Sequence, residues 1–275
     1  MKTLISIVLG LIIGFVSNID AQSFQGIATY KSHRKVDLKM DEKNVDAEMQ
    51  RQIQEQLRRQ FQQEYTLSFN QHESVYKQEE KLDAPNPVQS GIQIKISQGS
   101  DIMYKNAKEG RYVNKTEIFG KVFLIKDTLT TRNWELKNET KNIGEYTCFK
   151  AEFTDAYTTQ TLTDDGEMET VTKPRTTTVW YTPQIPINNG PSNFYGLPGL
   201  ILEVNDGDLT LVCTKIVLNP KNDVSIVEPN KGKEVTQQEF DDIQEKKSKE
   251  MMEQFQTRKG RDGDHGERVI IRVGG

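Results

Sequence analysis

Hydrophobic residues along much of this chain recur at every second position, the period of a β-strand that buries one face. The alternation is strict at 65–69 and 92–96. Further short apolar or aromatic runs, separated by turn residues, lie at 24–30, 75–76, 103–104, 111–113, 122–125, 134–136, 146–153, 176–181, 200–204 and 209–218. Because helical patterns do not alternate with these runs, they predict a mainly antiparallel β domain.

Two segments have the period of a helix instead. At 44–64 an apolar residue recurs every fourth position, which makes a narrow stripe on an otherwise polar helix. The second segment, 236–259, opens with Thr236 and Glu239 in the spacing of a helix start. We expect the first as an insertion that covers a sheet end or contacts a partner, and the second as a C-terminal helix. The β-branched run at 269–273 predicts one more strand.

A loop rich in Gly and Pro precedes the buried-looking strand at 200–204. Pro198 and Gly199 occupy the central positions of a type II turn, which needs a positive φ at the glycine. The residues expected to shape this loop are Gly190, Pro191, Gly196, Pro198 and Gly199. The loop either folds inward, where its apolar side chains fill the sheet, or faces outward as a rigid binding lip. In the outward case a ligand would meet Trp180, Phe194, Tyr195 and Leu197.

The stretches 134–151 and 179–204 resemble the GLPGLI family, which is named after the string at 196–201. The first stretch carries a Trp, an Ile-Gly turn at 143–144 and Cys148, as members of that family commonly do. The family implies a secreted bacterial envelope protein without an established activity. The order of strands is also similar to envelope proteins with a curved half-barrel, the lipoprotein carrier fold. We therefore expect a curved antiparallel sheet or half-barrel.

The N-terminus has the pattern of a secretory signal peptide. A short positive start is followed by an apolar run at 4–16, and Ala21 marks a cleavage position before a polar region. The alternative is an N-terminal membrane anchor, but the run is shorter than the ~20 residues of a spanning helix. We expect residues 1–21 to be removed and 22–275 to form a single domain without a transmembrane span. Its location would be the periplasm or cell surface of a Gram-negative bacterium.

Composition narrows the classes of partner. The formal net charge is −4 and 28% of residues are charged, which argues against nucleic acid and gives no attraction to an anionic membrane. Cys148 and Cys213 are the two cysteines of the chain. In an oxidising compartment they could form one disulfide, or they could remain two free, partly buried thiols.

Candidate catalytic groups are sparse. The three histidines lie in polar surroundings, and no motif for a nucleophile, a zinc site or a phosphate loop occurs. The acidic runs at 164–169 and 262–267 lack the spacing of a calcium loop. We therefore expect neither an enzyme nor a bound metal or cofactor; a hydrolase with an unrecognised site ranks third among the hypotheses.

Two functional hypotheses remain. The first is an exported, non-enzymatic binding protein of the cell envelope that holds an apolar ligand, such as a lipid or a hydrophobic peptide, at the loop. The alternative is a scaffold component of an envelope assembly, which would contact an envelope protein through its two amphipathic helices.

Overall fold

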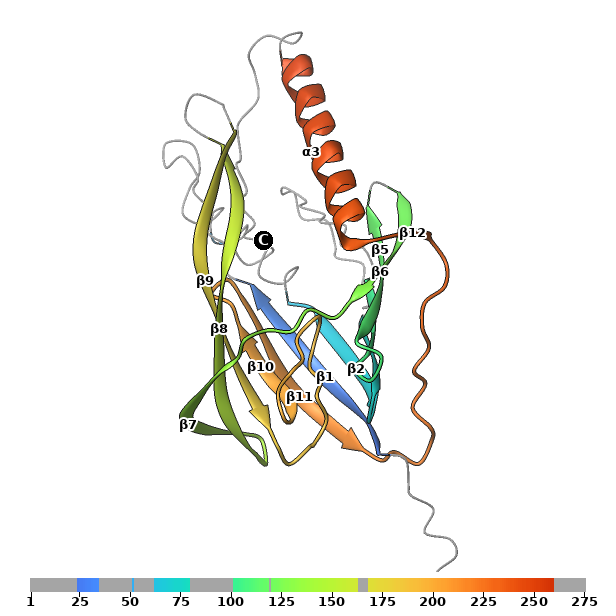
Figure 1. The fold of residues 1–275 in the computed structure, drawn as a ribbon, viewed down its shortest axis with the longest axis vertical. Helices are drawn as coiled ribbons and strands as arrows, with labels where there is room; N and C mark the ends of the chain where they lie inside the picture. Colours follow the sequence, from blue (N-terminus) through green and yellow to red (C-terminus); the bar gives the residue numbers. More distant parts are fainter. Residues whose placement is uncertain are drawn as a thin grey trace, which may run out of the picture.

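A computed structural model describes residues 24–34, 51, 62–79, 101–118, 120–162 and 168–259. Within these residues, twelve strands form one curved sheet that does not close into a barrel (Figure 1). The strands are β1 (Gln25–Arg34), β2 (Glu64–Asn70), β3 (Glu73–Gln78), β4 (Ile102–Asn106), β5 (Arg111–Ile118), β6 (Lys121–Thr128), β7 (Glu135–Ile143), β8 (Tyr146–Leu162), β9 (Met168–Thr182), β10 (Leu200–Asn205), β11 (Leu209–Leu218) and β12 (Lys233–Val235). This confirms the mainly β fold.

The strand order is β12-β6-β5-β4-β3-β2-β1-β11-β10-β9-β8-β7. Neighbours are antiparallel except β12 and β6, which are parallel. Most neighbours are also consecutive in the chain, as hairpin connections require. The exception at the centre is β1, which pairs with β2 on one side and with β11 on the other. This pairing joins the two halves of the chain in one sheet.

The two faces of the sheet are buried under different parts of the chain. The face that carries Tyr30, called here the Tyr30 face, places Tyr65 of β2 and Cys213 of β11 in register beside it. The core cluster that contains Tyr30 consists of Ala28, Tyr30, Leu67, Phe69, Tyr76, Cys148, Ile185, Ile187, Leu200, Leu202 and Cys213. The opposite face, at β3 to β6, buries Val75, Tyr104, Val113 and Leu124.

The C-terminal helix is α3 (Gln237–Lys259), and its predicted start is confirmed. The hydroxyl of Thr236 accepts a hydrogen bond from the Glu239 N–H, and the Glu239 carboxylate accepts one from the Thr236 N–H. Phe240 is buried against Phe123 of β6, with ring centroids 5.5 Å apart. Beyond these first turns α3 projects away from the sheet (Figure 1).

Several predicted segments lie outside the described residues. These are the signal peptide, nearly all of the helix at 44–64, the strand at 92–96, the hairpin tip at 164–167 and the strand at 269–273. Within 44–64 the described residues are Arg51, which is helical, and 62–64, of which Glu64 begins β2. In the part of the chain that the structure describes, no helix has the length and apolarity needed to cross a membrane.

Candidate functional site

The loop at 183–199 joins β9 to β10 and folds inward. Ile185 and Ile187 are buried in the cluster that contains Tyr30. Leu197 is buried in a second cluster, with Val179 and other residues of β8 to β11. The apolar side chains of the loop thus fill parts of two core clusters. Of the two arrangements considered for this loop, the structure has the inward one.

Lys105 of β4 binds the middle of the loop, at 190–194, which is its part most distant from β9 and β10 in the sheet. Its side chain is 1% exposed, and its Nζ lies 2.7 Å from the carbonyl oxygens of Gly190 and Ser192 and 3.2 Å from that of Phe194. The three acceptors match the three N–H donors of an ammonium group, whereas a neutral amine has only two. Burial lowers the pKa of Lys105 well below its usual range, whereas the three carbonyls favour its charged form.

Other side chains bind the rest of the loop backbone. Arg132 donates to the Asn193 carbonyl at 2.7 Å, and the Trp134 indole N–H donates to that of Tyr195 at 3.0 Å. The Asn189 side-chain amide donates to the Ser74 hydroxyl at 2.9 Å, in a buried contact with β3. Five backbone carbonyls between 190 and 195 therefore accept hydrogen bonds from side chains outside the loop.

The predicted type II turn at 197–200 is wrong. Gly199 does not have a positive φ; in this loop Ser192 and Gly196 have one, at 50° and 101°. The Gly199 N–H instead donates to the Leu197 carbonyl at 2.8 Å, in a three-residue turn around Pro198. A Cβ on Gly199 would overlap the Thr182 carbonyl and lie 2.8 Å from the Pro183 nitrogen. This glycine is needed because two backbone segments pass close together, not because of its φ.

The four residues predicted to line a ligand site lie in different surroundings. Leu197 is buried in its core cluster, and Phe194 packs under the Arg132 guanidinium, 4.9 Å from its ring centroid. Trp180 packs against the other cluster and has the Lys141 ammonium 4.4 Å from its ring centroid. Tyr195 is half-buried, and its carbonyl binds Trp134.

The two cysteines are free and buried. Cys148 on β8 and Cys213 on β11 are separated in the sheet by β9 and β10, although both belong to the cluster that contains Tyr30. Burial raises the pKa of the Cys148 thiol to about 11 and that of Cys213 to about 12. Such thiols are poor nucleophiles at neutral pH because little thiolate forms.

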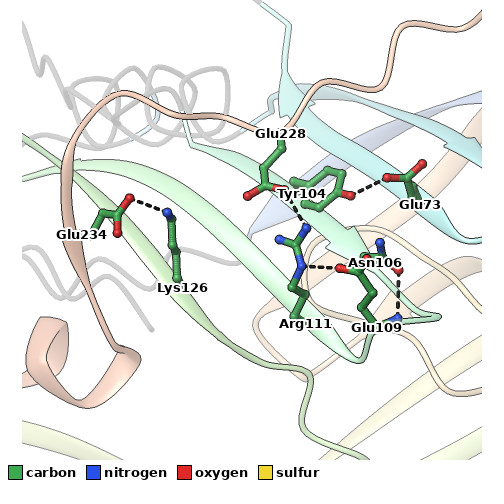
Figure 2. A network of polar contacts seen from close by, with 8 residues as sticks. All are labelled: Glu73, Tyr104, Asn106, Glu109, Arg111, Lys126, Glu228 and Glu234. Carbon is green, nitrogen blue, oxygen red and sulfur yellow. Dashed lines mark hydrogen bonds and ion pairs between the residues drawn. The ribbon is translucent and has the colours of Figure 1, made fainter.

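A second polar cluster lies where the segment at 219–232 crosses β4 and β5 on its way from β11 to β12. Figure 2 shows Arg111 between Glu109 and Glu228, at 2.5 and 2.8 Å, and Tyr104 donating to Glu73 at 2.5 Å. Burial and the Glu73 contact raise the pKa of Tyr104 to about 12, and the Tyr104 hydrogen bond lowers the pKa of Glu73. The tyrosine thus stays neutral and the carboxylate charged, as a structural tie requires.

Sequence reasoning missed Lys105. Its inward orientation could have been predicted, because Lys105 lies two positions after the apolar Met103 and therefore on the same face of the strand. A lysine at an inward position is the signal, although its carbonyl partners, some 85 residues away in the chain, could not be deduced. The described residues contain no group of three or more His, Cys, Asp or Glu side chains arranged to hold a metal ion.

Comparisons with known proteins find a family match for part of the chain. Residues 134–203 match the model of a family described as "Protein of unknown function (Porph_ging)". An uncharacterised family therefore fits the region around β7 to β10 and the loop. No curated protein matches the chain. Among solved structures, "Structure of PNGF-II in C2 space group" is similar with 15% identity and a TM-score of 0.46, over 80% of this chain and 32% of that one. The chain thus spans about a third of that protein.

Proposed function

We propose that this chain is an exported, non-enzymatic binding protein of the Gram-negative envelope, and that it binds an extended segment of another envelope protein. The observation that carries this proposal is the outer edge of β8. From Phe153 to Leu162, β8 pairs with β9 alone among the described strands, because its pairing with β7 ends at Glu152. An unpaired strand edge offers a row of N–H and C=O groups to another extended chain.

The distal part of β8 and β9, at 153–162 and 168–177, forms an arm. It extends past the rest of the sheet from the end where α3 also projects (Figure 1). Thr154 pairs with Thr176 and Thr158 with Thr172 through their hydroxyls, at 2.9 and 3.0 Å. Arg175 also lies 4.4 Å from the Tyr157 ring centroid and 3.6 Å from the Asp155 carboxylate, so polar cross-strand contacts contribute to holding the arm.

The two edges of the arm differ in how they are protected. The β9 edge carries Lys173, Pro174 and Arg175, and proline and basic residues are common means of blocking strand addition. The β8 edge contains neither proline nor a basic residue between 153 and 162, and Asp155 is its one charged residue. At the far ends of the sheet, β7 is rich in charged residues and has an irregular register, and β12 has three residues. Among the described strands, the β8 edge is thus the one without these means of protection.

The inward position of the loop favours this proposal over an apolar ligand held at the loop. Trp180, Phe194 and Leu197 already pack against protein groups. A lipid or apolar peptide at that place would have to displace them.

Register identifies which backbone groups face outward. Ala156 is opposite Pro174. Because proline has no N–H, it is tolerated in a strand where that position does not donate to the neighbouring strand, so these two residues form a non-hydrogen-bonded pair. Ala156 and every second residue beside it therefore present their N–H and C=O groups to the free edge. Thr172 occupies the equivalent position on the β9 edge, since it lies opposite Thr158.

The test compares Ala156→Pro, which blocks the β8 edge, with Thr172→Pro, which blocks the β9 edge. Each full chain is expressed with its own leader in a Gram-negative envelope, and complexes are purified after mild crosslinking. We expect the wild type and Thr172→Pro to retain a partner and Ala156→Pro to lose it. In the complex, hydrogen exchange at the amides of 154, 156 and 158 should slow at least tenfold.

Two results would overturn the proposal. A partner retained by Ala156→Pro without protection of these amides would place the binding surface elsewhere. An unprocessed chain found only in the cytoplasm would remove the envelope from the proposal.

A further inference from the structure

We propose that Lys105 acts as a latch on the loop at 183–199, so that loss of its ammonium group frees the loop from the Tyr30 face while the sheet stays folded. The proposal is independent of the β8 edge. It rests on the carbonyl contacts of Lys105, on the distance in the sheet between β4 and the loop's own strands, and on the core that the loop covers.

The loop reaches across much of the sheet to meet Lys105. It begins at β9 and ends at β10, whereas Lys105 is on β4, and β3, β2, β1 and β11 lie between β4 and β10. Near its own strands the loop is held by backbone hydrogen bonds, from Leu200 to Ile185 and from Ile201 to Asn189. Within its stretch at 190–194 one backbone hydrogen bond forms, from the Phe194 N–H to the Pro191 carbonyl at 3.1 Å. Lys105 binds three carbonyls of this stretch.

Removing the ammonium leaves those carbonyls without their donor. Gly190 is buried, so water cannot replace the donor unless the loop moves. The neighbouring side-chain contacts are single hydrogen bonds, which Asn189 donates to Ser74, Arg132 to the Asn193 carbonyl and Trp134 to the Tyr195 carbonyl. The lowest-energy way to hydrate the carbonyls is therefore for this end of the loop to open, because the strands themselves keep their ladder bonds.

The chain contains natural reporters of such an opening. Both of its cysteines are buried in the cluster to which the loop contributes Ile185 and Ile187. When the opening that begins at 190–194 extends to Ile187 and Ile185, this cluster loses part of its cover and the thiols of Cys148 and Cys213 meet solvent. The rate at which a soluble disulfide reagent labels them under native conditions then reports the open population.

The experiment measures this rate at pH 8 without denaturant for the wild type, Lys105→Met and Lys77→Met. Methionine keeps the length of the lysine stem but removes the donors. Lys77 lies on the neighbouring strand β3 and is exposed, so its variant makes the same charge change without touching the loop. We expect Lys105→Met to be labelled at least tenfold faster with an unchanged far-ultraviolet circular dichroism spectrum, and Lys77→Met to stay within twofold of the wild type.

Chemical rescue tests the donor role directly. Lys105→Ala should be labelled fast in buffer and return toward the wild-type rate in millimolar methylammonium, which can donate to the three carbonyls. Tetramethylammonium has the same charge but no N–H group and should not restore protection. Equal rescue by both ions would contradict the latch, since it would show that charge alone suffices.

Two further results would overturn the proposal. If Lys105→Met is labelled at the wild-type rate, the lysine does not hold the loop. If the variant loses its β-sheet spectrum, the decisive measurement is native-state hydrogen exchange on the wild type. Amides at 190–196 should exchange through an opening that is insensitive to denaturant, while amides of β1 exchange through global unfolding. Exchange of both sets only through global unfolding would show that the loop never opens by itself.

Discussion

Gly199 sits where the loop backbone passes against the end of β9, and the absence of a side chain is what permits this approach. A Cβ there would overlap the Thr182 carbonyl, and both neighbours are backbone atoms that cannot rotate aside. We expect Gly199→Ala to lower the free energy of unfolding by about 1–3 kcal/mol or more, as overpacking in a core does. Urea unfolding followed by tryptophan fluorescence measures the loss.

Gly144→Ala is the matched control for this substitution. Gly144 has a φ of 58° but open space around its Cβ position, so alanine there costs only the backbone strain of about 1–2 kcal/mol. A smaller effect at Gly199 than at Gly144 would mean that the close approach relaxes easily.

Individual residues also mark the limit of sequence reasoning at this site. The Pro198-Gly199 pair predicts a turn, and a turn is present, but the pair does not reveal that the positive φ values are at Ser192 and Gly196. Nor does a strand residue such as Lys105 reveal that its partners are backbone carbonyls. Both facts depend on which remote segments meet, and local propensity contains no information about that.

The start of α3 is an element whose stability is set locally. Thr236 and Glu239 satisfy each other's backbone N–H groups, and Phe240 is the buried anchor of the first turn. We expect Thr236→Ala to destabilise the helix by about 1 kcal/mol, the usual cost of losing an N-cap oxygen. Hydrogen exchange at the first amides of α3 should speed up about fivefold, the rate change that corresponds to this energy.

The same variant should leave the sheet intact, because α3 projects away from it after its first turns (Figure 1). The urea midpoint of tryptophan fluorescence should therefore not change, and Thr236→Ser, which keeps the oxygen, should behave as the wild type. A midpoint that falls together with the helix would show that α3 supports the sheet.

Elements with a hydrophobic alternation or a continuous apolar run were predictable, and stretches without such a pattern were not. The alternating residues at 65–69 correspond to β2, and the apolar run at 200–204 corresponds to β10. By contrast, β8 and β9 extend well beyond the predicted 146–153 and 176–181. The arm is rich in threonine, which favours strands but gives no contrast between a buried and an exposed face. The feature on which the proposed function rests is therefore one that periodicity misses.

At the scale of the whole molecule, the curved sheet was predicted as a class, but its strand order was not. The central pairing of β1 with β11 joins residues up to 192 positions apart, as Gly26 and Leu218 are. Nothing in either strand's own pattern selects the other as a neighbour. The chain forms two meanders, β1 to β6 and β7 to β11, and the pairing arises where their edge strands β1 and β11 meet.

This topology predicts that the family-matched segment at 134–203 cannot fold alone. It contains β7 to β9 and most of β10, but it lacks β11, which pairs with β10, and Lys105 and Ser74, which hold the loop. Isolated, it would expose the core residues Leu200, Ile201 and Leu202, all fully buried in the chain. A fragment of this size that lacks the strands and side chains covering its core residues falls below what burial can stabilise.

We therefore expect the isolated fragment 134–203 to show narrow amide proton dispersion and no cooperative urea transition, while the chain from 24 to 259 shows both. Adding the fragment 24–128 in trans supplies Lys105 and Ser74 but still not β11, so it should not restore dispersion. Adding 24–128 together with 204–259 supplies all three and should. A dispersed spectrum for 134–203 alone would mean that β7 to β10 and the loop form an independent unit, and the carbonyl contacts of Lys105 would then be a late docking step rather than part of the core.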